Sequence, residues 1–179
     1  MSTTATVSVP AGTWVVDPVH SSANFEVEHG EISAFHGGFK PIDAKLIAGD
    51  SGLQLEGAVG VASVTINDEN IKPHLLSPDF FDADRNPDVR FRSTEITGTP
   101  DDLRVVGELS MAGVSKSVEA RGRIRGPVDF GGPQKLSLAL ETAIDRTDYG
   151  MDWQMKLPSG QDALGYEIKL TVVLELVQE

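Results

Sequence analysis

The chain has no cysteine, and this absence excludes disulfide bonds, thiol catalysis and cysteine metal sites together. Aromatic residues make up only 6% of the sequence, and no apolar run approaches the length of a membrane-spanning helix. Basic residues are also in deficit, with 15 Lys and Arg against 27 Asp and Glu. The resulting formal charge of −12 argues against a nucleic-acid partner, whose phosphates require clustered Lys and Arg.

The N-terminal segment also lacks the parts of a targeting signal. Residues 1–11 contain no Lys or Arg and no apolar run, whereas a secretory signal peptide has both. We expect these residues to form a mobile polar tail and the protein to be cytoplasmic. The remaining residues, 12–179, suit one domain with a sizeable core.

Apolar and polar residues alternate with a period of two along most of the chain, which is the pattern of half-buried β-strands. The longest run continues from Tyr166 to Val177, and another covers residues 135–145. Turn signals such as Gly49-Asp50-Ser51-Gly52 separate the runs. We predict an all-β fold of eight or nine long strands, closed into an antiparallel barrel because long open edges invite aggregation.

One segment, from Asn67 to Asp82, breaks the period of two. Asn67 or Asp68 could serve as a helix N-cap, and Pro73 fits a helix only in its first turn. We predict a short helix or lid segment over residues 68–82 that covers one end of the barrel. Its apolar residues are Leu75, Leu76, Phe80 and Phe81.

The strands carry many small residues, which bears on how full the barrel is. Side chains alone can just fill an eight-stranded barrel. Small residues that point inward would leave a dry lumen for a long apolar guest; alternatively, they relieve crowding where the sheet coils tightly. Composition favours neither alternative. The residues are Ala23, Ala44, Ala48, Gly57, Ala58, Gly60, Ala62, Gly107, Ala120, Gly122, Ala139 and Ala143.

The most distinctive motifs lie in three segments. The first is Trp14-Val15-Val16-Asp17-Pro18-Val19-His20-Ser21, and the second is His74-Leu75-Leu76-Ser77-Pro78-Asp79-Phe80-Phe81-Asp82. The third combines Gly107-Glu108-Leu109 with Asp145-Arg146-Thr147-Asp148-Tyr149-Gly150-Met151 and Trp153. In this order, over roughly residues 12–177, they resemble the YceI-like family of lipocalin-like polyisoprenoid-binding proteins.

The resemblance implies an extended, eight-stranded antiparallel barrel of the lipocalin type that binds, stores or transports a polyisoprenoid. A similar long-chain amphiphile, such as an isoprenoid quinone or isoprenoid phosphate, is an equivalent guest. No catalytic constellation is implied, so we expect no enzyme activity and no cofactor apart from a bound isoprenoid lipid. The chain departs from the family at Ile71 and Lys72, where members usually carry an Arg-Asp pair.

Candidate ligand contacts are the apolar residues expected in the lumen, because burial of apolar area drives lipid binding, at roughly 25 cal/mol per Å². They are Trp14, Phe25, Val27, Phe39, Leu75, Phe80, Phe81, Phe91, Leu109, Met111, Leu138, Leu140, Met151 and Trp153. Three polar residues, His20, His74 and Arg146, are expected at the barrel mouth. We also expect a buried or half-buried ion pair between Asp145 and Arg146.

Two alternatives to lipid binding stay open. The first is an enzyme that acts on such a lipid through His20, His74 or the Asp79–Asp82 cluster, which requires two of these groups within hydrogen-bond reach at the lumen. The second is a packed barrel that binds a protein partner or forms a homodimer. The histidines show no tight metal spacing, so no metal site is expected. Arginines near the Asp79–Asp82 cluster favour solvated salt bridges there.

Overall fold

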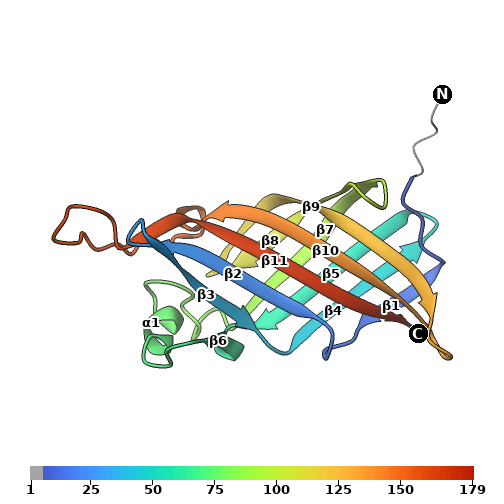
Figure 1. The fold of residues 1–179 in the computed structure, drawn as a ribbon, viewed down its shortest axis with the longest axis horizontal. Coiled ribbons are helices and arrows are strands. Elements are labelled where there is room, and N and C mark those ends of the chain that lie inside the picture. The colour runs from blue at the N-terminus through green and yellow to red at the C-terminus, as the bar shows by residue number, and fades with distance from the viewer. Residues whose placement is uncertain (1–5) are drawn as a thin grey trace.

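Strands account for most of the computed structural model, which describes residues 6–179 (Figure 1). The strands are β1 (Gly12–Val16), β2 (Ser22–His29), β3 (Ser33–Phe39), β4 (Ile42–Gly49), β5 (Gly52–Gly60), β6 (Val64–Ile66), β7 (Asp88–Gly98), β8 (Leu103–Met111), β9 (Val114–Asp129), β10 (Gln134–Asp145) and β11 (Leu164–Gln178). Helical segments are 3₁₀ turns η1 (Val61–Ser63) and η2 (Arg146–Tyr149) and the α-helix α1 (Lys72–Leu76). Within residues 6–179, no helix has the length and apolarity to span a membrane.

An antiparallel ring of eight strands closes the barrel, as predicted. Strand β1 pairs with β4 on one side and with β11 on the other, which joins the two ends of the strand order β4-β5-β7-β8-β9-β10-β11. Neighbouring strands of this order are linked mostly by short hairpins, which explains the antiparallel pairing.

Strand β11 changes partner along its length and so forms a seam in the wall. Its C-terminal residues pair with β1, where Leu176 lies opposite Val16. Its N-terminal half pairs with β2, where Ile168 lies opposite Val27. Strands β3 and β6 continue the sheet beyond β2, and β6 is its last strand.

The barrel has two unlike ends. The start of β1 and the C terminus lie at one end, called here the terminal end, and α1 lies at the other, the α1 end (Figure 1). A continuous core fills the terminal end, with Trp14, Leu138 and Leu176 almost fully buried. A second apolar cluster, which includes Phe80 and Met151, lies at the α1 end.

Residues before β1 lie against the terminal end of the barrel. The Val7 amide donates to the carbonyl of Gly98 at 3.0 Å, and Val7 and Val9 pack on the core. The Trp14 indole N–H donates to the carbonyl of Pro10 at 3.1 Å. The part of the expected mobile tail from Val7 onward is therefore attached, because its two valines bury apolar area; residues 1–5 lie outside the described residues.

Helix α1 is shorter than the segment predicted to contain it. It begins at Lys72, with Pro73 in its first turn as expected. The predicted N-cap is wrong, because the Asp68 side chain instead accepts from the Asn70 amide in a preceding turn. The cap position belongs to Ile71, which has no side-chain acceptor. Turns and irregular backbone then lead to β7.

Candidate functional site

The lumen is hollow toward the α1 end and contains two adjoining cavities. One has a volume of about 340 Å³ and lies beneath α1, and the other, of about 180 Å³, extends toward the terminal end. Both are lined almost wholly by apolar groups. They adjoin one another, because they share five lining residues: Phe25, Phe39, Val89, Leu109 and Leu170.

Most of the predicted ligand contacts lie around these cavities. The residues that line at least one of them are Phe25, Val27, Phe39, Leu75, Phe80, Phe81, Phe91, Leu109, Met111, Leu140, Met151 and Trp153. Trp14 and Leu138 line neither; both are almost fully buried in the packed core of the terminal end. Periodicity places a side chain inside a barrel, but it does not tell the filled part of the interior from the hollow part.

Several cavity residues were missed from the sequence. Ile168 and Leu170 lie on the inward face of β11, and the period of two from Tyr166 already indicated them. Ile144 likewise continues the inward face of β10. Met155 comes from the irregular loop after η2, where no periodic signal exists. Ile71, which replaces a charged residue of the family pattern, also lines the cavity.

The small residues of the strands divide between the two explanations left open by composition. Ala23, Ala44, Gly57 and Ala120 line the deeper cavity and leave it unfilled. Other glycines are required by close approach: a Cβ on Gly122 would lie 1.8 Å from the carbonyl oxygen of Ala139. Small residues thus both hollow the lumen and allow the sheet to coil.

Aromatic rings form the wall between α1 and the barrel. Phe39 lies 6.0 Å from Phe81 and 5.8 Å from Phe25, measured between ring centroids. The His74 ring packs edge-on against Phe80 at 5.0 Å and Trp153 at 4.9 Å. These contacts attach the segment after β6 to the barrel rim through apolar surface.

Arg146 is buried at the α1 end and lines the larger cavity. Its Nε donates to the carbonyl of Gly165 at 2.7 Å, and Nη1 donates to those of Met151 at 2.5 Å and Trp153 at 2.8 Å. The guanidinium also lies 4.6 Å from the centroid of the Tyr166 ring. Arg146 therefore holds the loop after η2 to the start of β11.

The expected ion pair between Asp145 and Arg146 is wrong. The Asp145 carboxylate caps η2, accepting from the amide of Thr147 at 2.9 Å and from its hydroxyl at 2.7 Å, and these bonds lower its pKa. Burial lowers the pKa of the neighbouring Arg146 guanidinium. Asp145 ends β10 with its carboxylate exposed, whereas Arg146 begins η2 with its side chain buried, which separates the two charges. Burial also raises the pKa of Tyr149 to about 12.

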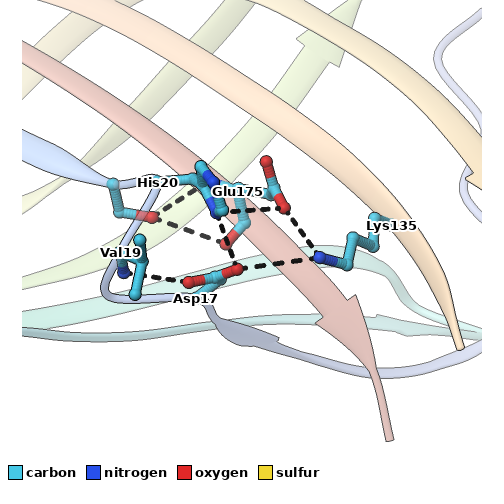
Figure 2. A network of polar contacts seen from close by, with 6 residues as sticks. Asp17, Val19, His20, Lys135 and Glu175 are labelled. Atoms are coloured by element: carbon cyan, nitrogen blue, oxygen red, sulfur yellow. Dashed lines mark hydrogen bonds and ion pairs between the residues drawn. The ribbon is translucent and has the colours of Figure 1, made fainter. Parts of the chain in front are cut away.

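His20 lies away from the cavity, in a network on the barrel's outer surface near the terminal end (Figure 2). Its Nδ1 lies 3.0 Å from Asp17 and 3.7 Å from Glu175. The Lys135 ammonium lies 3.7 Å from Asp17 and 3.1 Å from Glu175. The hydrogen bond to Asp17 raises the pKa of His20, and the same bond lowers the pKa of Asp17.

This network also contains the residues with the best spacing for a metal ion. Ligand atoms of Asp17, His20 and Glu175 all lie within 4.8 Å of one another. Lys135 already bridges the two carboxylates and supplies the positive charge that they attract. We therefore interpret these four residues as an ion-pair network and not as a metal site.

The acidic stretch after α1 forms exposed pairs, but among the described residues the predicted arginine partner is found for Asp88, at the start of β7, and not for Asp79 or Asp82. Arg90 lies 2.7 Å from Asp88, and His74 Nε2 lies 3.0 Å from Asp79. His74 also lines the cavity, whereas Asp79 does not. One of the two requirements of the enzyme alternative, a pair within hydrogen-bond reach, is met here.

A further hollow, of about 430 Å³, lies on the outer face of β4, β5, β7 and β8. It is charged with both signs: Glu56 pairs with Lys45 at 3.4 Å and with Arg92 at 3.8 Å. Such exposed, mutually satisfied pairs describe a solvated surface.

Sequence comparison relates the chain to known proteins over nearly its whole length. A family model described as the YceI-like domain matches residues 14–176. A UPF0312 protein of Staphylococcus aureus strain N315 is 28% identical over 167 residues, which cover 89% of this chain and 94% of the relative.

Solved structures share the fold. BcnA of Burkholderia cenocepacia superposes with a TM-score of 0.75 at 18% identity, covering 89% of this chain and 98% of its own. A Campylobacter jejuni YCEI protein gives 0.71 at 24% identity, covering 85% and 90%. A polyisoprenoid binding domain from Saccharophagus degradans, implicated in plant cell wall breakdown, gives 0.68 at 11% identity, covering 93% and 98%. These likenesses establish the architecture.

Proposed function

Because the chain belongs to the YceI-like family, we propose that it binds a polyisoprenoid or similar long-chain amphiphile, such as an isoprenoid quinone or phosphate, in the barrel lumen, for storage or transport. The observation that carries the proposal is the pair of adjoining apolar cavities, of about 340 and 180 Å³, between the packed core and α1. Small-molecule pockets commonly have volumes of about 300–1,000 Å³. The binding domain from Saccharophagus degradans has the same fold, which supports the same class of guest.

The shape of the space suits a chain more than a compact guest. The larger cavity lies under the aromatic rings at the α1 end, and the smaller one continues along the barrel axis past Phe25 and Leu109. A guest in both would bury its apolar surface against strands on all sides, which is the main driving force for such binding.

Organic extraction of the purified protein, followed by mass spectrometry, tests the proposal directly. We expect a co-purifying isoprenoid lipid, or saturable binding of an added isoprenoid such as farnesol to the extracted and refolded protein. A protein that carries no lipid and binds no added isoprenoid contradicts the proposal.

Substitution of one small lining residue ties binding to the lumen. A Cβ on Gly57 would meet nothing nearer than the Asp43 carbonyl oxygen at 3.7 Å, so Gly57→Leu places a side chain in the deeper cavity. We expect farnesol binding to weaken at least about tenfold, because the apolar volume is occupied. Gln54→Leu, on the outward face of the same strand and outside the lining of both cavities, is the matched control and should bind like the wild type.

The pairing of His74 with Asp79 at the cavity rim favours a second candidate function, an enzyme that alters the bound lipid. His74 also has a complete packing role between Phe80 and Trp153, so we favour binding without turnover. Prolonged incubation with a bound isoprenoid should return it unchanged in mass. A product formed by the wild type and absent with His74→Gln would establish the enzyme instead.

The cytoplasmic location and a homodimer stay predictions. Cell fractionation with a specific antibody tests the first, and sedimentation at several protein concentrations tests the second.

A further inference from the structure

The buried guanidinium of Arg146 forms no ion pair with a described carboxylate, although Asp145, Asp152 and Asp162 lie near enough to act on its pKa. None of the ion pairs among residues 6–179 includes this side chain. Its neighbours Asp145 and Asp162 are otherwise engaged, with Thr147 and with Lys156 respectively. A buried cation that carbonyl dipoles and one aromatic ring solvate still favours an anion nearby, because the surroundings screen charge weakly.

One face of the guanidinium group also keeps unused hydrogen-bonding capacity. Arginine has five N–H donors, two of them on Nη2. The described acceptor of Nη2 is the Leu164 carbonyl at 3.4 Å, which is long for a hydrogen bond, whereas Nε and Nη1 are fully engaged at 2.5–2.8 Å. At least one Nη2 hydrogen therefore has no partner among the described residues.

The position of Arg146 makes the two ends of the hollow chemically different. The polar side chains that line the larger cavity are His29, His74 and Arg146, and Arg146 is the one with a permanent charge. The space continues from there into the smaller cavity, whose inward-facing wall is apolar. A guest with one polar end would place that end near Arg146 and its chain along the barrel axis.

From these three observations we propose that Arg146 selects guests with an anionic oxygen head group, a carboxylate or a phosphate ester, on an apolar chain. The inference rests on the proposed lipid-binding function and adds the charge of the ligand to it. The guanidinium is already held in place by Gly165, Met151 and Trp153, so no side-chain ordering opposes the contact.

Three ligands with one isoprenoid chain test the proposal: farnesol, farnesyl phosphate and farnesoic acid. Charge-assisted hydrogen bonds to a buried cation should make the wild type bind the two anions about 10- to 100-fold more tightly than the alcohol. The tighter of the two anions identifies the head group. Equal binding of all three overturns the anionic preference and leaves lipid binding intact; binding of none overturns the proposed function as well.

Substitutions test whether the preference for anionic guests depends on Arg146. Arg146→Gln should bring the affinity ratio of anion to alcohol to about one, while Arg146→Lys, which keeps the charge, should retain part of it. Arg123→Gln, on the exposed face of β9, is the control and should keep the full ratio. A full ratio in Arg146→Gln contradicts the proposal.

Substitution of Arg146 also removes the hydrogen bonds that hold the loop after η2, which by itself would change binding. A measurement on the wild-type protein avoids this effect. The Nε–H signal of Arg146 in a ¹⁵N-arginine-labelled protein should shift on addition of farnesyl phosphate and stay in place with farnesol. A signal that the phosphate leaves unmoved overturns the proposal without any substitution.

Discussion

Two glycines on the inward face of the barrel have opposite structural roles. A Cβ on Gly107 would lie 2.4 Å from the Phe91 ring and 2.5 Å from the carbonyl oxygen of Arg92. A Cβ on Gly57 would have nothing nearer than 3.7 Å. Gly107 is needed for close approach of β7 and β8, whereas Gly57 leaves empty space in the lumen.

Alanine at each position should therefore change stability in opposite directions. We expect Gly107→Ala to lower the free energy of unfolding by about 1–3 kcal/mol, because neighbouring backbone must move. Gly57→Ala should be neutral or stabilising by about 0.5 kcal/mol, through reduced freedom of the unfolded chain. Urea denaturation measures both. Similar values for the two variants would show that the close approach at Gly107 is not restrictive.

Single residues were also the least predictable from sequence. The motif from Asp145 to Gly150 indicated that Arg146 matters, but not that its guanidinium turns inward to four carbonyl groups. His20 was expected at the mouth, and the structure places it beside Glu175 in the terminal half of β11. Such placements depend on pairings between distant strands, which a local pattern does not contain.

At the scale of elements, the turn between β1 and β2 is attached to β10 and β11 by the network in Figure 2. The charge of His20 helps this attachment, since its pKa lies above the ordinary 6.5 in the folded protein. Its contribution to stability is complete below the unfolded-state pKa and is lost as pH rises through the folded-state pKa. The Asp17 carboxylate has a lowered pKa in the folded protein. Its contribution to stability is therefore complete above the ordinary pKa of 3.8 and is lost as pH falls through the folded-state pKa.

We therefore expect His20→Gln to be most destabilising between about pH 4 and 6.5, and progressively less so as pH rises through the raised folded-state pKa of His20. The melting temperatures of wild type and variant across this range measure the difference. In an Asp17→Asn background the difference should shrink, because the main partner of His20 is gone. A wild-type advantage that grows with pH would contradict this account.

The elements themselves followed from sequence in proportion to their periodicity. The long runs now in β10 and β11 were predicted almost to their ends, because every second residue is apolar. Strand β6 has three residues and α1 has five, too few to display a period. Their positions are set by contacts with β3 and with the aromatic rings of the rim.

At the scale of the whole molecule, the barrel divides into a filled half and a hollow half. Leu138 on β10 is 2% exposed within the packed core, and Leu109 on β8 is 7% exposed but lines both cavities. The two leucines have similar burial and different surroundings. The alternative of a fully packed barrel is not compatible with this division.

Replacing each leucine with alanine should show the difference between the filled and the hollow half as a difference in unfolding free energy. Leu138→Ala should cost about 2–5 kcal/mol of unfolding free energy, since it opens a void in a filled core. Leu109→Ala should cost less, because its side chain already faces empty space on one side. Urea denaturation of the lipid-free protein makes the comparison. Equal costs would indicate that the lumen is filled in solution.

Sequence predicted the barrel but not where the hollow lies, and the class of guest stays a prediction. Alternation shows which side chains face inward, and family motifs show what related barrels hold. Whether Gly57 leaves a gap or Gly107 avoids a clash depends on the side chain across the strand, Ala44 or Phe91. The boundary between core and cavity is a property of the assembled barrel.

The seam along β11 has a consequence for how a guest enters. Strands β2, β3 and β6 are joined to the ring through β11, and β6 has β3 as its one neighbour in the strand order. This three-strand panel is joined to the ring by one hydrogen-bonded ladder, so we expect the panel, and not the ring, to move when a guest enters the lumen. The packed half would stay closed meanwhile, held by β1 on both sides. We therefore expect guest entry and barrel closure to depend on different strands.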